Sequence, residues 1–420
     1  MTAPLPTQAR VVIIGGGVVG CSVAYHLGKL GWTDVVLLER KRLTSGTTWH
    51  AAGLLPQLRA TVNMTKLAQY TGNLYASLEA ETGLSTGYQR KGSLGIALGA
   101  ARLEEFARLA SLAKVTGIEA HMLSPAQCLA RYPLLEGKGV LGGIFTPQDA
   151  QGDPANITLA LAKGARNAGV RIYENVAVIG VTQAGGRATG VTTHQGPITA
   201  EIVVNCAGMW GRDVGLMAGV HVPLQACEHF YVLTEPIPGL ARNLPILRIP
   251  DECAYYKEDA GKLLVGFFEP VAKPWAVKGI PADFEFGTLP DDWDHILPQL
   301  EAALARMPVL AKHGIHTFFN GPESFTPDDR YMLGEAPNLG GFFVAAGFNS
   351  VGIQSAGGAG KVLAEWIVQG APPMDLHDVD IRRILPFQNT KAYLVPRVTE
   401  TLGLLYADHF PYRQMAITGQ

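Results

Sequence analysis

The segment Gly15-Gly-Gly-Val-Val-Gly20 restricts most strongly what this chain can fold into. It follows the β-branched run at residues 11–14 and precedes a helical stretch from residue 18 to about residue 29. The apolar run at 35–38 then ends at Glu39. Strand, glycine turn, helix, strand and acidic residue, in this order, are typical of a Rossmann unit that binds a dinucleotide. An ordinary strand–turn–helix connection is the alternative, but Glu39 stands nineteen residues after Gly20, where the fingerprint needs an acid.

Each glycine of this segment has its own physical role. Gly15 permits the tight turn, Gly17 lets the backbone approach a pyrophosphate, and Gly20 lets the helix pack closely on the strand. The helix N-terminus offers N–H groups to the phosphates, and Glu39 accepts hydrogen bonds from ribose hydroxyls. The fingerprint does not distinguish FAD from NAD. The contacts expected in this unit are Gly15, Gly17, Val18, Val19, Gly20, Glu39 and Arg40.

Charge and hydropathy exclude several classes of protein. The 420 residues carry 34 Lys plus Arg against 36 Asp plus Glu, and the net charge of −2 leaves no basic field for nucleic acid or anionic lipid. The polar N-terminus is no signal peptide, and no apolar segment approaches the length of about 20 residues that spans a membrane. The five cysteines are scattered without a C-x-x-C pair, which argues against disulfides and zinc. We therefore expect a cytoplasmic protein without a metal, a nucleic-acid partner or a membrane.

The order of the expected elements predicts an α/β protein with two interleaved domains. Residues 1–90, 145–220 and 326–370 are expected to form a discontinuous, Rossmann-like cofactor-binding domain. Residues 91–144 and 221–325 are expected to form a mainly antiparallel α+β substrate domain, because runs such as 254–257 and 263–268 alternate like antiparallel strands. Residues 371–420 carry prolines and turn signals, which predict a C-terminal arm rather than a core unit.

Further segments carry a resemblance that covers nearly the whole chain. They are Ser45-Gly-Thr-Thr-Trp-His-Ala-Ala-Gly-Leu-Leu55, Val204-Asn-Cys-Ala-Gly208 with Trp210, Glu228-His-Phe-Tyr231, Phe325-Thr-Pro-Asp328 and Gly347-Phe-Asn-Ser-Val-Gly352. Together they resemble the FAD-dependent dimethylglycine and sarcosine dehydrogenases of the D-amino-acid oxidase superfold. The resemblance implies that the cofactor is FAD. The further FAD contacts it implies are Thr47, Thr48, His50, Leu54, Val176, Ala207, Gly208, Trp210, Gly347, Asn349, Ser350, Val351 and Gly352.

His50 occupies the place at which several members of this family bond a histidine covalently to the flavin. From the residues alone, His50 is a loop histidine beside Trp49 that is packed or solvated, although a neutral imidazole is a competent nucleophile. His26 lies closer to the glycines, but its position inside the expected helix indicates a structural role. The resemblance therefore favours a covalent link at His50.

His229 and Tyr255 fall where the family places its substrate-facing histidine and tyrosine. Strand alternation sends Tyr255 and Tyr256 to opposite faces, so only one of them faces the substrate, and we assign that face to Tyr255. On their own patterns, His229 is a half-buried strand residue and the tyrosines pack the sheet.

The reaction that the resemblance implies is oxidation of the N-methyl group of a small N-methylated amino acid. A hydride passes to flavin N5, and the resulting iminium hydrolyses to formaldehyde and the demethylated amine. His229 would take the ammonium proton or hold the amine neutral, and Tyr255 would orient the amine or the carboxylate. The electron acceptor is either oxygen or an electron-transfer protein.

Two features depart from the dehydrogenase pattern. The dehydrogenases usually continue into a folate-binding domain, whereas this sequence ends at Gln420, so we infer no folate partner. Cys227-Glu-His-Phe-Tyr231 and Asp292-Trp-Asp-His295 are also similar to the regulatory subunit of pyruvate dehydrogenase phosphatase. A non-catalytic, flavin-binding regulatory subunit is therefore the alternative, although the combination of His50 with His229 and Tyr255 favours an enzyme.

Overall fold

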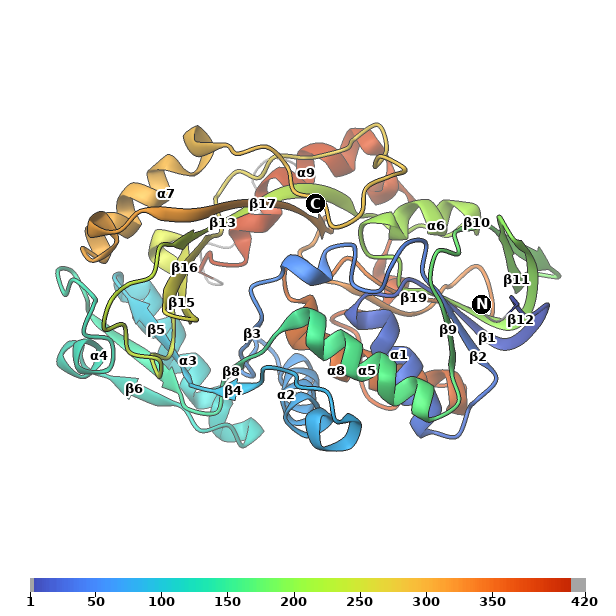
Figure 1. Cartoon of the computed structure of the whole chain (residues 1–420), viewed down its shortest axis with the longest axis horizontal. Coiled ribbons are helices and arrows are strands. Elements are labelled where there is room, and N and C mark those ends of the chain that lie inside the picture. The colour runs from blue at the N-terminus through green and yellow to red at the C-terminus, as the bar shows by residue number, and fades with distance from the viewer. Residues whose placement is uncertain (1–3, 409–420) are drawn as a thin grey trace.

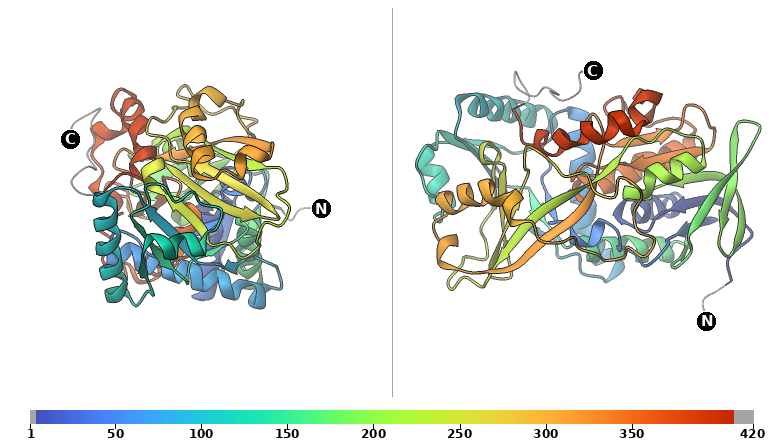
Figure 2. Two further views of the ribbon diagram at one scale, coloured as in Figure 1. Left: turned by 90° about the vertical axis from the view of Figure 1, so that its left-hand side faces the viewer. Right: turned by 90° about the horizontal axis from the view of Figure 1, so that it is seen from above.

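Two large β-sheets form the body of the protein. The computed structural model describes residues 4–408. The two sheets lie side by side along the long axis of the molecule, and the first is at the end that carries the N-terminus (Figures 1 and 2). A small third sheet lies between them and consists of β3 (Leu54–Leu55), β8 (Ala150–Gln151) and β4 (Gln89–Arg90).

The first sheet has a parallel centre. β12 pairs in parallel with β1 and β19, β1 pairs with β2, and β2 pairs with β9, while β10, β11 and β18 add antiparallel strands. Residues 11–14 and 35–38 are buried throughout because the sheet is covered on both faces. The strands are β1 (Gln8–Ile14), β2 (Val35–Leu38), β9 (Arg171–Tyr173), β10 (Val178–Ala184), β11 (Arg187–Thr193), β12 (Gly196–Asn205), β18 (Met332–Glu335) and β19 (Phe342–Ala346).

Helices pack closely on one face of the first sheet (Figure 1). They are α1 (Val18–Lys29), α2 (Val62–Thr82), α5 (Pro154–Asn167) and α8 (Gly352–Gln369), while α6 (Gly211–Met217) packs into the core on the other face. Glycines make this packing possible, since a Cβ at Gly358 would collide with the backbone of Leu67 and one at Gly360 with Ser22. α1 follows β1 and α8 follows β19, so both helices begin at the carboxyl edge of the parallel strands. Ligands bind at this edge in open α/β sheets.

The second sheet is antiparallel except where β14 runs parallel to β5. Its strands are β5 (Ser93–Ala97), β6 (His121–Leu123), β7 (Gly142–Thr146), β13 (Gln225–Thr234), β14 (Ile246–Ile249), β15 (Ala254–Asp259), β16 (Lys262–Phe267) and β17 (Ile315–Phe325). Its associated helices are α3 (Ala100–Thr116), α4 (Pro125–Arg131) and α7 (Trp293–Arg306). The predicted fold class, a Rossmann-like α/β unit interleaved with a mainly antiparallel α+β unit, is confirmed. The exact domain boundaries stay a prediction.

One helix, α9 (Lys391–Leu404), is not among the elements expected from the sequence. It lies in the segment expected as an arm, yet Leu394, Val398 and Leu402 are fully buried and pack in one cluster with residues of the second sheet. Pro396 lies inside the helix, where it removes one backbone hydrogen bond, so the burial of these apolar side chains outweighs the proline that suggested a turn. Residues 409–420 of the expected arm lie outside the described residues. Within residues 4–408, no helix has the length and apolarity that crossing a membrane requires.

Candidate active site

The turn between β1 and α1 has the geometry that a dinucleotide needs. Gly15 has a φ of +113°, and a Cβ there would collide with the Cys206 carbonyl group. A Cβ at Gly20 would collide with the Gly15 carbonyl oxygen, so this glycine lets α1 lie against the turn. Gly17 precedes α1 and has no side chain to cap it, although Thr48 Oγ1 accepts a hydrogen bond from the Val18 N–H at 3.1 Å. The N-terminus of α1 therefore faces an open cavity in front of the turn.

Glu39 follows β2 and turns its carboxylate back toward the glycines. Its Oε2 accepts a hydrogen bond from the Gly16 N–H at 2.7 Å, and its Oε1 accepts one from the Lys41 N–H at 2.8 Å. Burial raises the pKa of this carboxyl, and the two backbone hydrogen bonds oppose that effect. Each oxygen keeps a second lone pair and Glu39 lines the cavity, so the geometry permits the ribose contact, which stays a prediction.

The cavity extends from the glycine turn along the carboxyl edge of the first sheet. Arg40 closes one side, where its Cζ lies 4.5 Å from the ring centre of Trp210 and its guanidinium donates to the Ala282 carbonyl. Most of the residues predicted to contact the cofactor line this cavity. They are Gly15, Gly17, Val18, Val19, Glu39, Arg40, Thr47, Thr48, Val176, Ala207, Gly208, Trp210, Gly347, Asn349, Ser350 and Gly352. Gly20 packs behind the turn, and His50, Leu54 and Val351 line a neighbouring pocket instead.

The loop between β19 and α8 forms the inner end of the cavity. Asn349 and Ser350 have φ angles of +47° and +60°, a conformation that non-glycine residues adopt rarely. The Asn349 side chain holds it, because Oδ1 accepts from the Thr326 N–H at 2.8 Å and Nδ2 donates to the Gly347 carbonyl at 2.8 Å. Ser350 lines both the cavity and the neighbouring pocket, so this loop fixes where the two meet.

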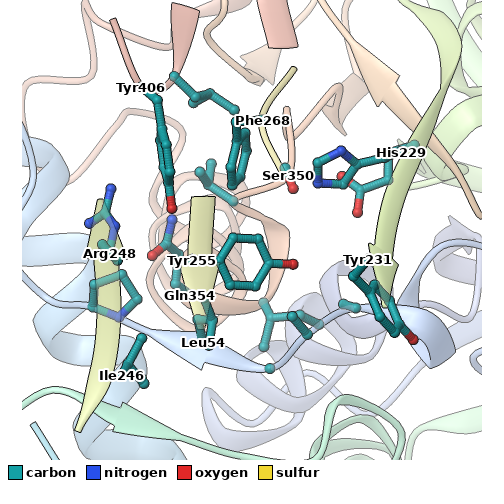
Figure 3. A pocket seen from close by; sticks show the side chains of 18 of the residues that line it. Leu54, His229, Tyr231, Ile246, Arg248, Tyr255, Phe268, Ser350, Gln354 and Tyr406 are labelled. Carbon is teal, nitrogen blue, oxygen red and sulfur yellow. The ribbon is translucent and has the colours of Figure 1, made fainter. Parts of the chain in front are cut away.

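The neighbouring pocket lies between the two sheets and adjoins the cavity at Ala51, Glu323, Ser350 and Ile353. Figure 3 shows its side chains. Arg248 and Tyr406 lie toward one end, His229 and Tyr231 lie toward the other, and Tyr255 stands between them. Residues of the second sheet, together with β3 and the segment at residues 350–354, therefore enclose one small pocket beside the cofactor cavity.

His50 ends the short 3-10 helix Thr48–His50 and is buried against Phe319, with ring centres 5.2 Å apart. A Cβ at Gly321 would come within 2.8 Å of His50 Cε1, so this glycine makes room for the imidazole. The imidazole of His50 donates a hydrogen bond to the backbone carbonyl of Pro322. Its Nε2 has no hydrogen-bond partner in the described part of the chain. Burial lowers the pKa of His50 to about 4, so the ring is neutral at pH 7 and Nε2 keeps a free lone pair.

His26 differs from His50 in this respect. Its Nδ1 bonds the Ser22 carbonyl at 2.7 Å and its Nε2 bonds the Tyr70 hydroxyl at 3.0 Å, so both ring nitrogens are occupied. His26 lies inside α1, as the sequence predicts.

The structure brings both predicted catalytic residues into the pocket. His229 lies in β13 opposite Gly321 of β17, and burial lowers its pKa to about 3. Tyr255 of β15 lines the pocket, whereas Tyr256 points to the other face and is buried in the core of the second sheet. Burial raises the pKa of Tyr255 well above its usual value, which keeps its hydroxyl protonated. Their roles stay a prediction.

The charged residues Arg248 and Glu323 of the pocket were not predicted from the sequence. Arg248 lies in β14, and its guanidinium donates a hydrogen bond to the Tyr406 hydroxyl. Glu323 lies in β17 and accepts a hydrogen bond from Ser350, and burial raises its pKa to about 7. A cation inside the apolar run Ile-Leu-Arg-Ile was a usable signal, because a charge buried in a strand needs a partner. Glu323 stands in a Pro-Glu-Ser sequence that carries no such signal.

A glycine turn at the carboxyl edge of parallel strands, with a small-molecule pocket beside it, defines an α/β protein that acts with a dinucleotide. The chain belongs to the FAD-dependent oxidoreductase family, whose model matches residues 10–366. A second model, the FAD-dependent oxidoreductase central domain, matches residues 369–417. The prediction of FAD as the cofactor is confirmed at the level of the family.

Three curated proteins show substantial sequence identity to this chain. The chain is 44% identical to 4-methylaminobutanoate oxidase (formaldehyde-forming) from Paenarthrobacter nicotinovorans, over 98% of this chain and 50% of that protein. It is 46% identical to human mitochondrial sarcosine dehydrogenase, over 90% of this chain and 42% of that protein. It is also 42% identical to the mouse pyruvate dehydrogenase phosphatase regulatory subunit, over 96% of this chain and 46% of that protein. The chain therefore spans about half the length of the curated relatives it matches.

The resemblance to the dimethylglycine and sarcosine dehydrogenases is confirmed by these relatives. Among solved structures, the L-proline dehydrogenase of P. horikoshii matches with a TM-score of 0.81 and 24% identity, over 90% of this chain and 98% of that one. This likeness supports the fold.

Proposed function

We propose that this chain oxidises the N-methyl group of a small N-methylated amino acid. The observation that carries the proposal is the charge pattern of the pocket beside the cofactor cavity. A guanidinium, Arg248, lies toward one end, and an imidazole, His229, lies toward the other (Figure 3). The carboxylate of Glu323 lies where the pocket meets the cavity. An amino-acid zwitterion has the complementary pattern, with its carboxylate at Arg248 and its amine at His229 and Glu323.

The residues present fit FAD. Gly17 leaves the backbone open toward the cavity, since a Cβ there would meet only Thr48 Oγ1, and the N-terminus of α1 faces the same cavity. When bound, the flavin supplies the two-electron acceptor for a hydride from the N-methyl carbon. His50 lines the pocket that adjoins the cavity, and its Nε2 is the atom we propose for a covalent link to the cofactor, because it is neutral, buried and without a partner among residues 4–408.

The side chains of the pocket prepare the substrate. Arg248 binds the carboxylate and so fixes which end of the molecule reaches the cavity. His229 takes the proton from the ammonium group, because only the neutral amine releases hydride from its methyl carbon. Tyr255 stays protonated and donates a hydrogen bond that orients the substrate. The iminium product then hydrolyses to formaldehyde and the demethylated amine.

The test is anaerobic addition of sarcosine, dimethylglycine, N-methylproline or 4-methylaminobutanoate to the flavin-containing protein. Loss of the oxidised-flavin absorbance is the expected result. Arg248→Met should raise the substrate concentration needed for half-maximal reduction at least tenfold for sarcosine, because one charge-assisted hydrogen-bonded pair is worth about 1.5–3 kcal/mol. The same variant should change the response to an N-methylalkylamine without a carboxylate less than about twofold. Equal effects on both compounds would remove Arg248 from carboxylate binding.

A second function is favoured by the identity to the phosphatase regulatory subunit. Under this alternative, the chain binds flavin but serves as a regulatory subunit without turnover. A protein that retains FAD and is not reduced by any of the N-methylated amino acids would support this alternative over the enzyme. Monitoring reoxidation by oxygen, in parallel with a dye that accepts electrons in place of a protein, would separate the two candidate electron acceptors.

A further inference from the structure

Two segments singled out in the sequence meet at one buried carboxyl group. Residues 227–231 lie in β13 and residues 292–295 begin α7, and Glu269 lies between them in the loop after β16. His229 Nδ1 is 3.9 Å from Glu269 Oε2, and His295 Nε2 is 4.0 Å from Glu269 Oε1. The Glu269 side chain is 2% exposed. These four atoms are buried and have no hydrogen-bond partner within residues 4–408.

Three neighbouring side chains whose facing polar atoms are buried without partners need an explanation, because each unmade hydrogen bond costs about 1–3 kcal/mol. Both imidazoles pack against phenylalanines, since His229 lies 5.0 Å from the ring centre of Phe268 and His295 lies 5.3 Å from that of Phe230. The three side chains are therefore held in a row, and their polar atoms face one another.

The two ends of the row lie in different surroundings. The inner end, His229, lines the pocket beside the cofactor cavity. The outer end, His295, has a side chain that is 19% exposed, and its backbone N–H donates to Asp292 Oδ1 at 3.2 Å at the start of α7. A hydrogen bond to the Val271 backbone occupies the other nitrogen of His295, which leaves Nε2 as an acceptor toward Glu269.

We propose that His229, Glu269 and His295 form a proton relay from the substrate pocket to the surface. The inference rests on the proposed function, which requires a proton to leave the substrate ammonium before its N-methyl group is oxidised. The proton passes to His229, and His229 Nδ1–H transfers a proton to Glu269 Oε2. Glu269 Oε1–H transfers a proton to His295 Nε2, and His295 releases one to solvent. One proton enters, one leaves, and no electrons move. Each gap is about 1 Å longer than a hydrogen bond, a distance that small side-chain rotations close.

The electrostatics of the row agree with this order of transfers. Burial raises the pKa of Glu269 to about 8, so at pH 7 it is a neutral acid that both accepts and donates a proton. Burial lowers the pKa of His229 to about 3 and that of His295 below its usual value, so neither imidazole retains the proton. The titratable groups that act on Glu269 are His229, Glu228 and Cys227 from β13, Glu323 from β17, Tyr255 from β15, Cys253 from the turn before it and His295 from α7.

The experiment is stopped-flow reduction of the flavin-containing protein under anaerobic conditions, with sarcosine or whichever N-methylated amino acid reduces the wild type. A pH indicator dye in weakly buffered solution reports proton release. In Glu269→Gln, reduction at pH 7 should slow at least tenfold, and proton release should lag behind it, because positioned acid–base groups contribute about 10²–10⁴-fold. Toward pH 10 the difference from the wild type should shrink to less than about twofold, because the amine then arrives neutral.

The matched controls come from an exposed pair of the same kind. His316 Nδ1 lies 3.4 Å from Glu235 Oε1 in the region of β17 and the end of β13, away from the pocket, and both side chains are about half exposed. His316→Asn and Glu235→Gln should leave the reduction rate unchanged at every pH. His295→Asn alters the partly exposed end of the row and should reproduce the pH-dependent defect if Glu269→Gln does not fold.

The outcomes separate the relay from the proposed function. If Glu269→Gln slows flavin reduction by the same factor at all pH values, Glu269 has a structural role and the relay is overturned. An unchanged reduction rate with unchanged proton release would also overturn the relay. A wild-type protein whose flavin is not reduced by any N-methylated amino acid would overturn the proposed function and the relay with it.

Discussion

At the scale of single residues, hydrogen-bond partners distinguish histidines that burial affects alike. Burial lowers the pKa of both His26 and His50 to about 4, so both rings are neutral at pH 7. In His26 both nitrogens have partners, whereas Nε2 of His50 has none in the described structure. A neutral nitrogen without a partner is the one whose lone pair remains available for bond formation.

Replacing His50 with alanine should leave FAD extractable by acid, because the proposed covalent bond has no other nucleophile in its place. The measurement is flavin fluorescence in the acid precipitate and in the supernatant. His26→Ala is the matched control, and it should lower stability while its flavin stays with the precipitate. Flavin that remains bound to the acid-precipitated His50→Ala chain would refute the assignment.

Some residues of the site were predictable from the sequence and others were not, for physical reasons. The glycines of the turn, His229 and Tyr255 stand in local patterns or in segments that a family resemblance identifies. Glu269 stands in a Glu-Pro pair after a strand, a pattern typical of an exposed turn. Its burial results from α7 and α9, which cover the loop from distant parts of the chain: His295 of α7 lies 4.0 Å from Glu269 Oε1, and a Cβ at Gly403 of α9 would lie 3.0 Å from the Glu269 carbonyl oxygen.

At the scale of elements, boundaries were predictable where glycines and buried β-branched runs set them. The expected limits of α1 and β2 agree with the structure, since a glycine turn stands before α1 and the buried run at residues 35–38 forms β2. α9 was not predictable from local signals, because its hydrophobic stripe is short and Pro396 lies inside the helix. The helix is stabilised by tertiary burial of Leu394, Val398 and Leu402.

The packing of α1 against the turn gives a prediction at this scale. Gly20→Ala should force the first turn of α1 away from Gly15 and so disturb the phosphate end of the FAD cavity. We expect a loss of about 1–3 kcal/mol in stability, as for other overpacked positions, together with reduced FAD occupancy. Thermal melting and the ratio of flavin to protein absorbance measure the two effects.

Gly99→Ala is the control, since Gly99 precedes α3 and a Cβ there meets nothing within 4 Å. It should melt close to the wild type and keep its flavin. Full FAD occupancy in Gly20→Ala would show that α1 tolerates the displacement and that the close approach is not needed for binding.

At the scale of the whole molecule, segments distant in the sequence (α7, α9 and the loop before α8) cover the second sheet and bury acids and imidazoles together. Burial raises the pKa of Glu269 to about 8 and that of Glu323 to about 7, and it lowers the pKa of His229 to about 3. His229 destabilises the fold as pH falls below 6.5, because its imidazole binds a proton more tightly in the unfolded chain than in the folded chain. The carboxyls act in the opposite direction, because the folded chain binds their protons more tightly than the unfolded chain does.

The raised pKa of Glu269 predicts how the stability of the fold depends on pH near and above neutrality. The stability linked to Glu269 is fully present below pH 4.5 and is lost as pH rises to its folded pKa of about 8. Between pH 6.5 and pH 8 the loss from this group is at most about 2 kcal/mol, since one pKa unit corresponds to about 1.4 kcal/mol. The melting temperature of Glu269→Gln should therefore fall less over this interval than that of the wild type, whereas Glu235→Gln, at an exposed site, should fall as much as the wild type. Calorimetric scans at the two pH values measure the difference. An equal fall in Glu269→Gln and the wild type would mean that Glu269 is already ionised at pH 6.5, and it would also remove the neutral acid on which the proton relay depends.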